Sequence, residues 1–197
     1  EKGELAAAPE AELRLMLVIG ESYDDIAQFD QAELVLRKTI SQAESLFHTD
    51  HALLARSLVD LGEVLRERGD IPGAELLLRQ QLEMRQRLFP GDHADVSESL
   101  AKLAALLDDK GDLAGAEVLY RQALAMRERI FTGDHESIAL AANNLGATLH
   151  GRGDLSAAEL FLRKAIDMQE RLFRGDHPAL ASSLDNLAAL SITRGDA

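Results

Sequence analysis

Apolar and small residues recur along this chain at helical spacing, in segments separated by short polar turns. One such pair of segments carries them at Leu58, Leu61, Gly62, Leu65, Ala74 and Leu78. Residues three or four positions apart share one face of an α-helix. Gly69 is expected to end the first segment in the left-handed conformation that other residues resist, and Asp70 to begin the second. The pattern therefore predicts pairs of helices joined by tight turns.

This two-helix pattern repeats every 42 residues along the chain. Its markers are Phe47, Phe89, Phe131 and Phe173; His51, His93, His135 and His177; and Gly69, Gly111, Gly153 and Gly195, each of which precedes an aspartate. A helix pair cannot bury its apolar face alone, so such units stack on their neighbours. The sequence predicts an all-α fold in which residues 1–197 form a single repeat array.

The markers also set the expected boundaries. We expect repeats at 9–47, 51–89, 93–131 and 135–173, and a ninth helix within 177–197 that is either the first helix of a truncated fifth repeat or a capping helix. Helices are expected at 30–47, 52–68, 72–88, 94–110, 114–130, 136–152, 156–172 and 178–194. The first repeat is divergent, because it lacks the Gly-Asp turn. Its first helix is expected to begin at Pro9, since proline is tolerated at a first helical position.

Composition narrows the classes of partner. The formal net charge of −13 argues against nucleic acid, whose binding needs clustered Lys and Arg, and against anionic lipid. No apolar run approaches the ~20 residues that span a bilayer. The absence of cysteine removes thiolate chemistry and suits a reducing, cytoplasmic location. The chain starts at Glu1 without a methionine, which is typical of a fragment of a longer protein.

The repeated Asp-His dipeptides are the first candidates for catalysis or metal binding. They stand at Asp50-His51, Asp92-His93, Asp134-His135 and Asp176-His177. Equivalent residues of neighbouring repeats are separated by a helix layer of roughly 8–10 Å, whereas zinc ligands sit ~2.0–2.2 Å from the ion. We therefore favour a capping role for these dipeptides. No nucleotide-binding loop or nucleophile motif is present, so we expect no enzyme activity and no cofactor or metal.

The repeat residues resemble those of tetratricopeptide repeats. The resemblance rests on the Leu-small pairs (Leu61-Gly62, Leu103-Ala104, Leu145-Gly146) and on Ala74, Ala116 and Ala158 in the second helices. The 42-residue period, with LF-x-GDH between repeats, resembles the array of kinesin light chain and its bacterial relatives. The residues Glu4, Leu5, Pro9 and Glu10 resemble the start of arrays that follow bacterial serine/threonine kinase domains. The resemblance implies a right-handed α-solenoid.

In that family the first helices line the concave groove, which implies a set of binding residues. These are Arg56, Glu63, Glu67, Lys102, Asp108, Asp109, Asn143, Asn144, His150 and Asn186. The early groove is acidic and the later groove is rich in amides, which can both donate to and accept from a peptide backbone. His150 is open to two interpretations, a groove contact or an isolated exposed histidine. Asn144 and Asn186 are either ligand contacts or solvated polar residues.

The resemblance therefore implies a non-catalytic protein-protein interaction module that binds an extended peptide or protein segment. The acidic groove favours a segment of basic character, because complementary charge selects partners. The alternative is a structural, self-assembling or regulatory array attached to another domain, such as a bacterial kinase. The ninth helix leaves apolar residues without a following helix, which predicts either more repeats or self-association.

Overall fold

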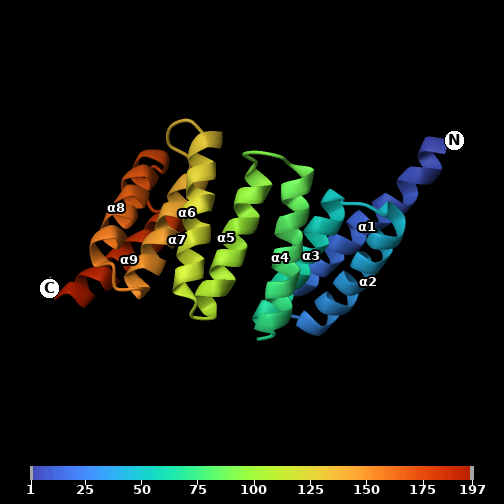
Figure 1. Ribbon diagram of the computed structural model, residues 1–197, viewed down its shortest axis with the longest axis horizontal. Helices are drawn as coiled ribbons and strands as arrows, with labels where there is room; N and C mark the ends of the chain where they lie inside the picture. The colour runs from blue at the N-terminus through green and yellow to red at the C-terminus, as the bar shows by residue number, and fades with distance from the viewer. Residues whose placement is uncertain (1, 196–197) are drawn as a thin grey trace. The chain divides into compact units, whose positions relative to one another are not determined.

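The computed structural model describes residues 2–195, with side chains from residue 9 onward. Within this range the chain forms nine helices and no strand (Figure 1). The helices are α1 (Lys2–Asp25), α2 (Phe29–Phe47), α3 (Ala52–Glu67), α4 (Ile71–Leu88), α5 (Ala94–Asp109), α6 (Leu113–Ile130), α7 (Glu136–Gly151), α8 (Leu155–Leu172) and α9 (Pro178–Arg194). The expected all-α fold is confirmed.

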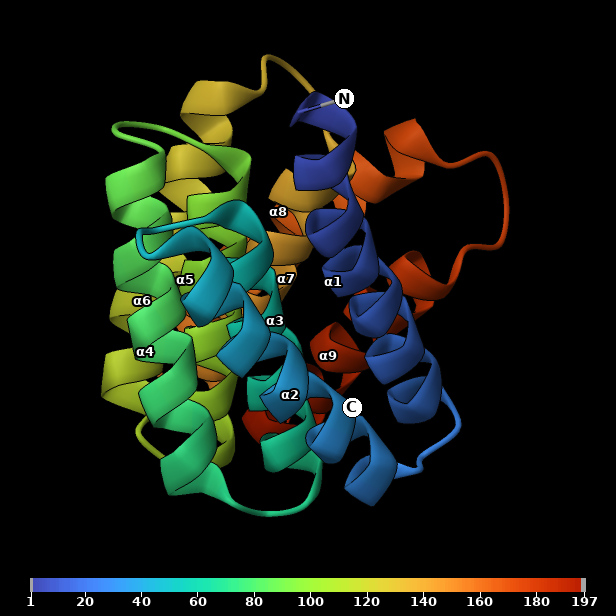
Figure 2. The same cartoon turned by 90° about the vertical axis from the view of Figure 1, so that its right-hand side faces the viewer.

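The helices belong to two compact units, Glu1–Gly91 and Asp92–Ala197. In the first unit α1 packs on α2, α2 on α3, and α3 on α4. In the second unit α5 packs on α6, α6 on α7, α7 on α8, and α8 on α9. Successive helices within each unit run in opposite directions (Figures 1 and 2). Each unit is therefore built from antiparallel helix pairs, as the repeat pattern predicts.

The turn inside each regular pair is formed by the Gly-Asp dipeptide. Gly69, Gly111 and Gly153 have φ values of 81°, 86° and 83°, in the left-handed region. The following aspartate accepts a hydrogen bond from the backbone N–H three residues later, for example from Gly115 to Asp112 Oδ1 at 3.0 Å. This bond satisfies one of the donors that a helix start leaves without a partner. The expected bounds of α2 to α9 agree with the structure to within one residue.

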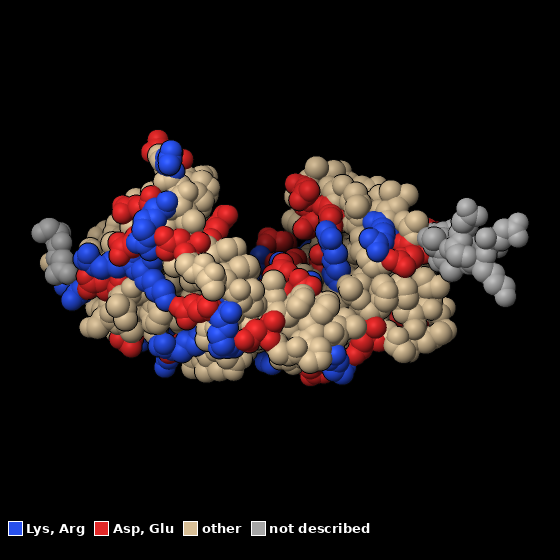
Figure 3. Space-filling view, turned by 90° about the horizontal axis from the view of Figure 1, so that it is seen from above, with Lys and Arg blue, Asp and Glu red and all other residues tan. Residues whose placement is uncertain are grey.

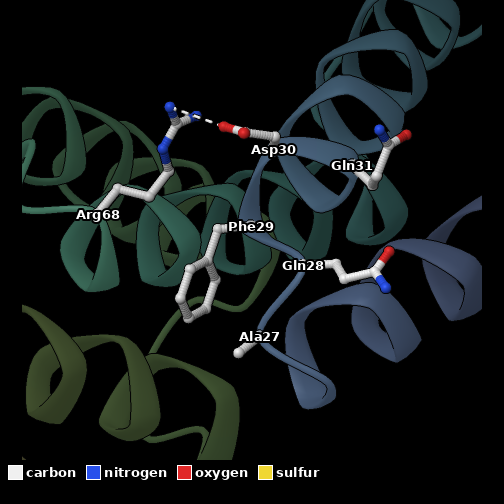
Figure 4. Close-up of a pocket in the computed structure, with 6 residues that line it drawn as sticks. All are labelled: Ala27, Gln28, Phe29, Asp30, Gln31 and Arg68. Atoms are coloured by element: carbon white, nitrogen blue, oxygen red, sulfur yellow. Dashed lines mark ion pairs between the residues drawn. The ribbon is translucent and has the colours of Figure 1, made fainter.

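The first repeat departs from this scheme at both ends of its first helix. The helix begins at Lys2, so the expectation that it starts at Pro9 is wrong, and Pro9 lies inside it. The alanine-rich segment before Pro9 explains the extension, because alanine has the highest helix propensity. At the turn, Ala27 has a φ of 56° where later repeats have glycine. Gln28 makes no side-chain cap for α2. Figure 4 shows this turn, where Arg68, the residue that follows α3, pairs with Asp30 at 2.9 Å.

The cores lie between the helices of each pair and depend on small residues at the crossing points. In the second unit the core includes Ala142, Leu145, Ala158 and Leu162, all fully buried. Gly146 lies where a Cβ atom would stand 2.7 Å from Leu162 Cγ. The small residues therefore permit the close approach of α7 and α8. In the first unit, Leu54, Ala55, Leu58 and Met84 form part of the core.

Candidate functional site

The Asp-His loops between repeats are built as helix caps. His51, His93, His135 and His177 are the N-cap residues of α3, α5, α7 and α9. In each, Nδ1 accepts a hydrogen bond at 3.2 Å from the backbone N–H two residues later. The rings of His51, His135 and His177 also stack on the preceding phenylalanine, at centroid distances of 3.5 to 3.6 Å. The capping role expected for these histidines is confirmed.

The aspartates of the loops are held by arginines from the end of the following second helix. Arg129 binds both carboxylate oxygens of Asp92 at 2.7 Å. Two equivalent bidentate pairs join Arg87 to Asp50 and Arg171 to Asp134. The arginine hydrogen bonds lower the pKa of each aspartate carboxyl. These three arginines, in the last turns of α4, α6 and α8, therefore stabilise the loops through ion pairs within the chain.

A second set of ion pairs links neighbouring repeats. Glu159 pairs with Arg163 on its own helix and with Arg194 of α9. Glu117 pairs with Arg121 on its own helix and with Arg152, the residue that follows α7. On the face drawn in Figure 3, acidic and basic side chains lie next to one another over the second unit, at the left. Among the residues that the structure describes, no group of three or more His, Cys, Asp or Glu side chains is placed to hold a metal ion.

Carboxylates gather where α1 and α3 end in the first unit. Asp24 is surrounded by the charges of Asp25, Glu63 and Glu67, with Arg66 as the nearby cation. Arg66 binds Glu63 and Glu67, each at 3.1 Å. Burial, followed by the repulsion of the three neighbouring carboxylates, raises the pKa of the Asp24 carboxyl. Glu63 and Glu67, two of the expected groove residues, thus belong to an electrostatically strained carboxylate cluster at this end of the first unit.

This strain predicts a pH-dependent effect of replacing Asp24. A carboxyl whose pKa is raised on folding destabilises the folded state when it is ionised. We therefore expect Asp24→Asn to raise the free energy of unfolding at pH 7. The gain should shrink as the pH falls through the raised pKa, and vanish below the unfolded value of about 3.9. Urea denaturation at neutral and acidic pH measures both effects.

The matched control for Asp24→Asn is Glu12→Gln, because Glu12 is an exposed carboxylate of the same helix that is not among the charges acting on Asp24. Removing one exposed charge should change stability much less than relieving the half-buried Asp24. Equal gains from the two variants, or a gain from Asp24→Asn that persists at low pH, would contradict the strained cluster.

Arg56, the third expected groove residue of the first unit, is engaged within the chain. Its Nε donates to Glu21 Oε1 of α1 at 2.9 Å, while its guanidinium lies 3.9 Å from Asp60. The Arg56–Glu21 pair joins the first helices of two successive repeats. We therefore treat Arg56 as a side chain that positions acidic groups.

Asparagine side chains form a hydrogen-bonded chain in the second unit. Asn186 Nδ2 of α9 donates to Asn143 Oδ1 of α7 at 3.0 Å, and Asn143 Nδ2 lies 3.4 Å from Asn144 Oδ1. Asn143 is buried, whereas Asn144 and Asn186 are half-exposed. The structure thus brings the three expected asparagines together. Asn143 is the central bridge, and the other two have surface available to a ligand.

The remaining expected residues of the second unit lie on the first helices α5 and α7. His150 Nε2 is 2.8 Å from Thr193 Oγ1 of α9, so this histidine has a partner. Asp108 Oδ2 accepts from Thr148 Oγ1 of α7 at 2.8 Å. Lys102 is half-buried on α5, and Asp109 is the exposed last residue of that helix. The His150–Thr193 and Asp108–Thr148 hydrogen bonds each join the first helix of one repeat to the first helix of the next.

Thr148 was not expected from the sequence, although a signal for it exists. The equivalent positions one repeat away on either side are Leu106 and Leu190, both buried. A single hydroxyl in an otherwise apolar register marks a buried polar contact, since buried polar groups are nearly always hydrogen-bonded. Thr148 meets that requirement through Asp108 and through the backbone oxygen of Asn144.

Known structures with the same fold include kinesin-light-chain-like repeat proteins. A kinesin light chain repeat protein described as putative, from Podospora anserina, is 20% identical over 94% of this chain and 88% of its own, with a TM-score of 0.81. BtubC (BKLC) from P. vanneervenii is 21% identical over 95% and 75%, with a TM-score of 0.84. RapI in its apo form is 14% identical over 94% and 49%, with a TM-score of 0.76. At these identities the likeness shows the fold, an α-solenoid of repeats.

Sequence comparison gives the family directly. No curated protein matches the chain, and no helix in the described part is both long and apolar enough to cross a membrane. The tetratricopeptide repeat profile matches residues 53–129, 95–171 and 137–197. Together these matches run from α3 to α9 and cover most of the chain. The chain therefore belongs to the tetratricopeptide repeat family.

Proposed function

We propose that this protein is a non-catalytic interaction module that binds an extended peptide or protein segment of basic character on its first helices. Tetratricopeptide repeats generally mediate protein–protein interactions. The observation that carries the proposal is the carboxylate cluster of Asp24, Asp25, Glu63 and Glu67 around Arg66. A lysine or arginine of the partner relieves this repulsion on binding.

The asparagines of the second unit support the peptide part of the proposal. An amide side chain can donate to a peptide carbonyl and accept from a peptide N–H. Asn144 and Asn186 are half-exposed, and Asn143 orients Asn186 through a 3.0 Å hydrogen bond. The asparagines therefore contribute to binding independently of the partner's side chains, whereas the carboxylates of the first unit select a positively charged partner.

A displayed library of random peptides tests this function directly. We expect the selected peptides to be enriched in Lys and Arg and to bind more weakly as salt rises. The double variant Asn144→Ala, Asn186→Ala should weaken all selected peptides alike, by on the order of tenfold for the loss of one or two hydrogen bonds. Charge reversal by Glu63→Lys should instead abolish the preference for basic peptides.

The control is Asp167→Lys, which reverses an exposed charge on the second helix α8. This change should leave both affinity and peptide preference as in the wild type. A library that yields no binder, or yields acidic peptides, would contradict the proposal. Such a result would instead favour a spacing role for the array beside another domain, such as a kinase.

The open face of α9 supports a second candidate function, which is self-association. Leu184 and Ile192 on this helix are 46% and 75% exposed. Large apolar side chains that gather on one exposed helix face are typical of interaction sites. Self-association through α9 is compatible with peptide binding, because Asn186 projects from a different side of the helix.

A further inference from the structure

An exposed aliphatic residue stands at the same place on the second helix of every complete repeat. Leu34, Leu76, Val118 and Leu160 are 42 residues apart and are 65%, 69%, 54% and 66% exposed. Leu34 and Val118 keep this exposure although another helix pair of the same unit follows each of them. The register seven residues later shows no such constancy, since it holds Ser41, Glu83, Ala125 and Asp167. Repetition of the segment alone therefore does not explain the aliphatic residue.

Folding of the array does not require this residue either. The core positions of the second helices lie two residues later, at Leu36, Leu78, Tyr120 and Leu162, and are at most 3% exposed. A side chain that stays more than half exposed removes little apolar area from water on folding. The exposed aliphatic register is therefore available for a contact outside the chain.

In the second unit two members of this register belong to one surface. The guanidinium of Arg121, three residues after Val118 on α6, lies 5.4 Å from the ring centroid of Phe161, the neighbour of Leu160 on α8. Lys164 of α8 also bonds to Glu128 of α6. Single exposed apolar side chains are ordinary on proteins, but those that share one surface are typical of interaction sites.

The helical neighbours of the two aliphatic residues are basic or neutral. Positions three and four residues away lie on the same side of a helix. They hold Ala114, Gly115, Arg121 and Gln122 around Val118, and Ser156, Ala157, Arg163 and Lys164 around Leu160. No carboxylate stands among these neighbours, although the formal net charge of the chain is −13.

The carboxylates that offset the arginines lie deeper than the arginines do. The Glu117 side chain is 13% exposed, whereas Arg121 and Arg152, which both pair with it, are 45% and 41% exposed. Glu159 is likewise less exposed than its partners Arg163 and Arg194. The surface around Val118 and Leu160 therefore presents mainly guanidinium groups to solvent.

We infer that this surface of α6 and α8 docks a protein segment whose apolar side chains are flanked by carboxylates. The apolar side chains of the segment cover Val118 and Leu160, and its carboxylates bind Arg121 and Arg163 through charge-assisted hydrogen bonds. An anionic membrane would offer similar chemistry, but the net charge of −13 opposes its approach. The partner is opposite in charge to the basic segment proposed for the first helices, so the two surfaces act independently.

Two labelled peptides of equal length test the chemistry of this surface. The first carries leucines at helical spacing flanked by glutamates, and the second has alanine in place of each leucine. We expect the first to bind with a Kd of roughly 10–100 μM and the second at least about tenfold more weakly. Binding of the first should also weaken as salt rises. Absence of binding by the first peptide in fluorescence anisotropy, or equal binding by the two, would overturn the inference.

Substitutions on α6 and α8 place the contact. The double variant Val118→Ser, Leu160→Ser should raise the Kd of the leucine-glutamate peptide by on the order of tenfold. Arg163→Gln should weaken binding and reduce its dependence on salt. The control is Leu140→Ser, because Leu140 is 47% exposed but lies on the first helix α7. After circular dichroism has shown that the variants fold, unchanged binding by the double variant, or an equal loss in the control, would overturn the inference.

A third peptide, with leucines and lysines, separates this surface from the first helices. Its binding should be weakened by Glu63→Lys and unaffected by Val118→Ser, Leu160→Ser. In the random-peptide selection, sequences that this double variant no longer binds belong to α6 and α8, and those it retains report on the first helices. Failure of either proposal is therefore seen by itself. Binding of the protein to phosphatidylserine vesicles that the double variant loses, without binding of the leucine-glutamate peptide, would assign the surface to a membrane and overturn the inference.

Discussion

Replacing Gly146 by alanine is expected to lower the free energy of unfolding by about 1–2 kcal/mol, because overpacking outweighs the gain in helix propensity. The added Cβ would stand 2.7 Å from Leu162 Cγ and 3.2 Å from the backbone oxygen of Ala158. A branch carbon and a backbone atom cannot move as freely as the end of a side chain. The helices α7 and α8 must therefore separate, which disturbs the core of the second unit.

The matched control is Gly62→Ala, at the same register of α3. There the added Cβ would lie 3.1 Å from Leu78 Cδ2, 3.2 Å from Leu78 Cγ and 3.7 Å from the Ala74 oxygen, so each contact is longer than its counterpart at Gly146. A small shift of Leu78 should nearly balance the gain of up to about 1 kcal/mol in helix propensity. Urea denaturation followed by circular dichroism measures both variants. Similar midpoints for the two variants would show that backbone contact does not decide the cost.

Replacing Arg127 by alanine should cost about 2–4 kcal/mol of stability, through lost packing and lost hydrogen bonds. This arginine of α6 is only 7% exposed. Its Nε donates to Ser97 Oγ of α5 at 3.2 Å, and its Nη1 donates to the backbone oxygen of Ser137, in α7, at 2.8 Å. Burial lowers the pKa of the guanidinium. The side chain thus ties three helices together at the expense of desolvating its charge.

The chain supplies its own control for this substitution. Gln169 occupies the equivalent position of α8, 42 residues later, and is 2% exposed without carrying a charge. We therefore expect Arg127→Gln to stay within about 1 kcal/mol of the wild type, because glutamine fills much of the space and can donate one of the two hydrogen bonds. A glutamine variant as unstable as the alanine variant would mean that the positive charge itself is required.

The repeat scaffold could be predicted from the sequence because local signals fix it. Gly-Asp turns such as Gly111-Asp112 set the helix ends, and apolar residues at helical spacing set the buried faces. Where those signals change, the prediction weakens. Pro9 is a favourable first helical residue, but nothing local to it shows that a helix already begins at Lys2. The helix start therefore depended on the preceding alanines rather than on the proline.

The candidate site could be predicted only in part, because its hydrogen bonds depend on how neighbouring first helices are offset. Asn144 and Asn186 are equivalent by sequence, yet Asn186 bonds to Asn143, at a separation of 43 residues rather than 42. His150 and Thr193 show the same separation. A one-residue offset between adjacent helices follows from their packing and cannot be read from a periodic alignment. The sequence therefore places these side chains on the first helices but does not give their hydrogen-bond partners within the chain.

The bonds between aspartate loops and arginines make the array suited to changes in length. Asp50 and Arg87, Asp92 and Arg129, and Asp134 and Arg171 are each separated by 37 residues. Each of these loops is therefore held by an arginine of the helix pair that directly follows it. Duplication of a 42-residue segment would bring with it both halves of a new bond and disrupt none of the old ones. A longer array can therefore arise by gene duplication, because no new type of contact between repeats is needed.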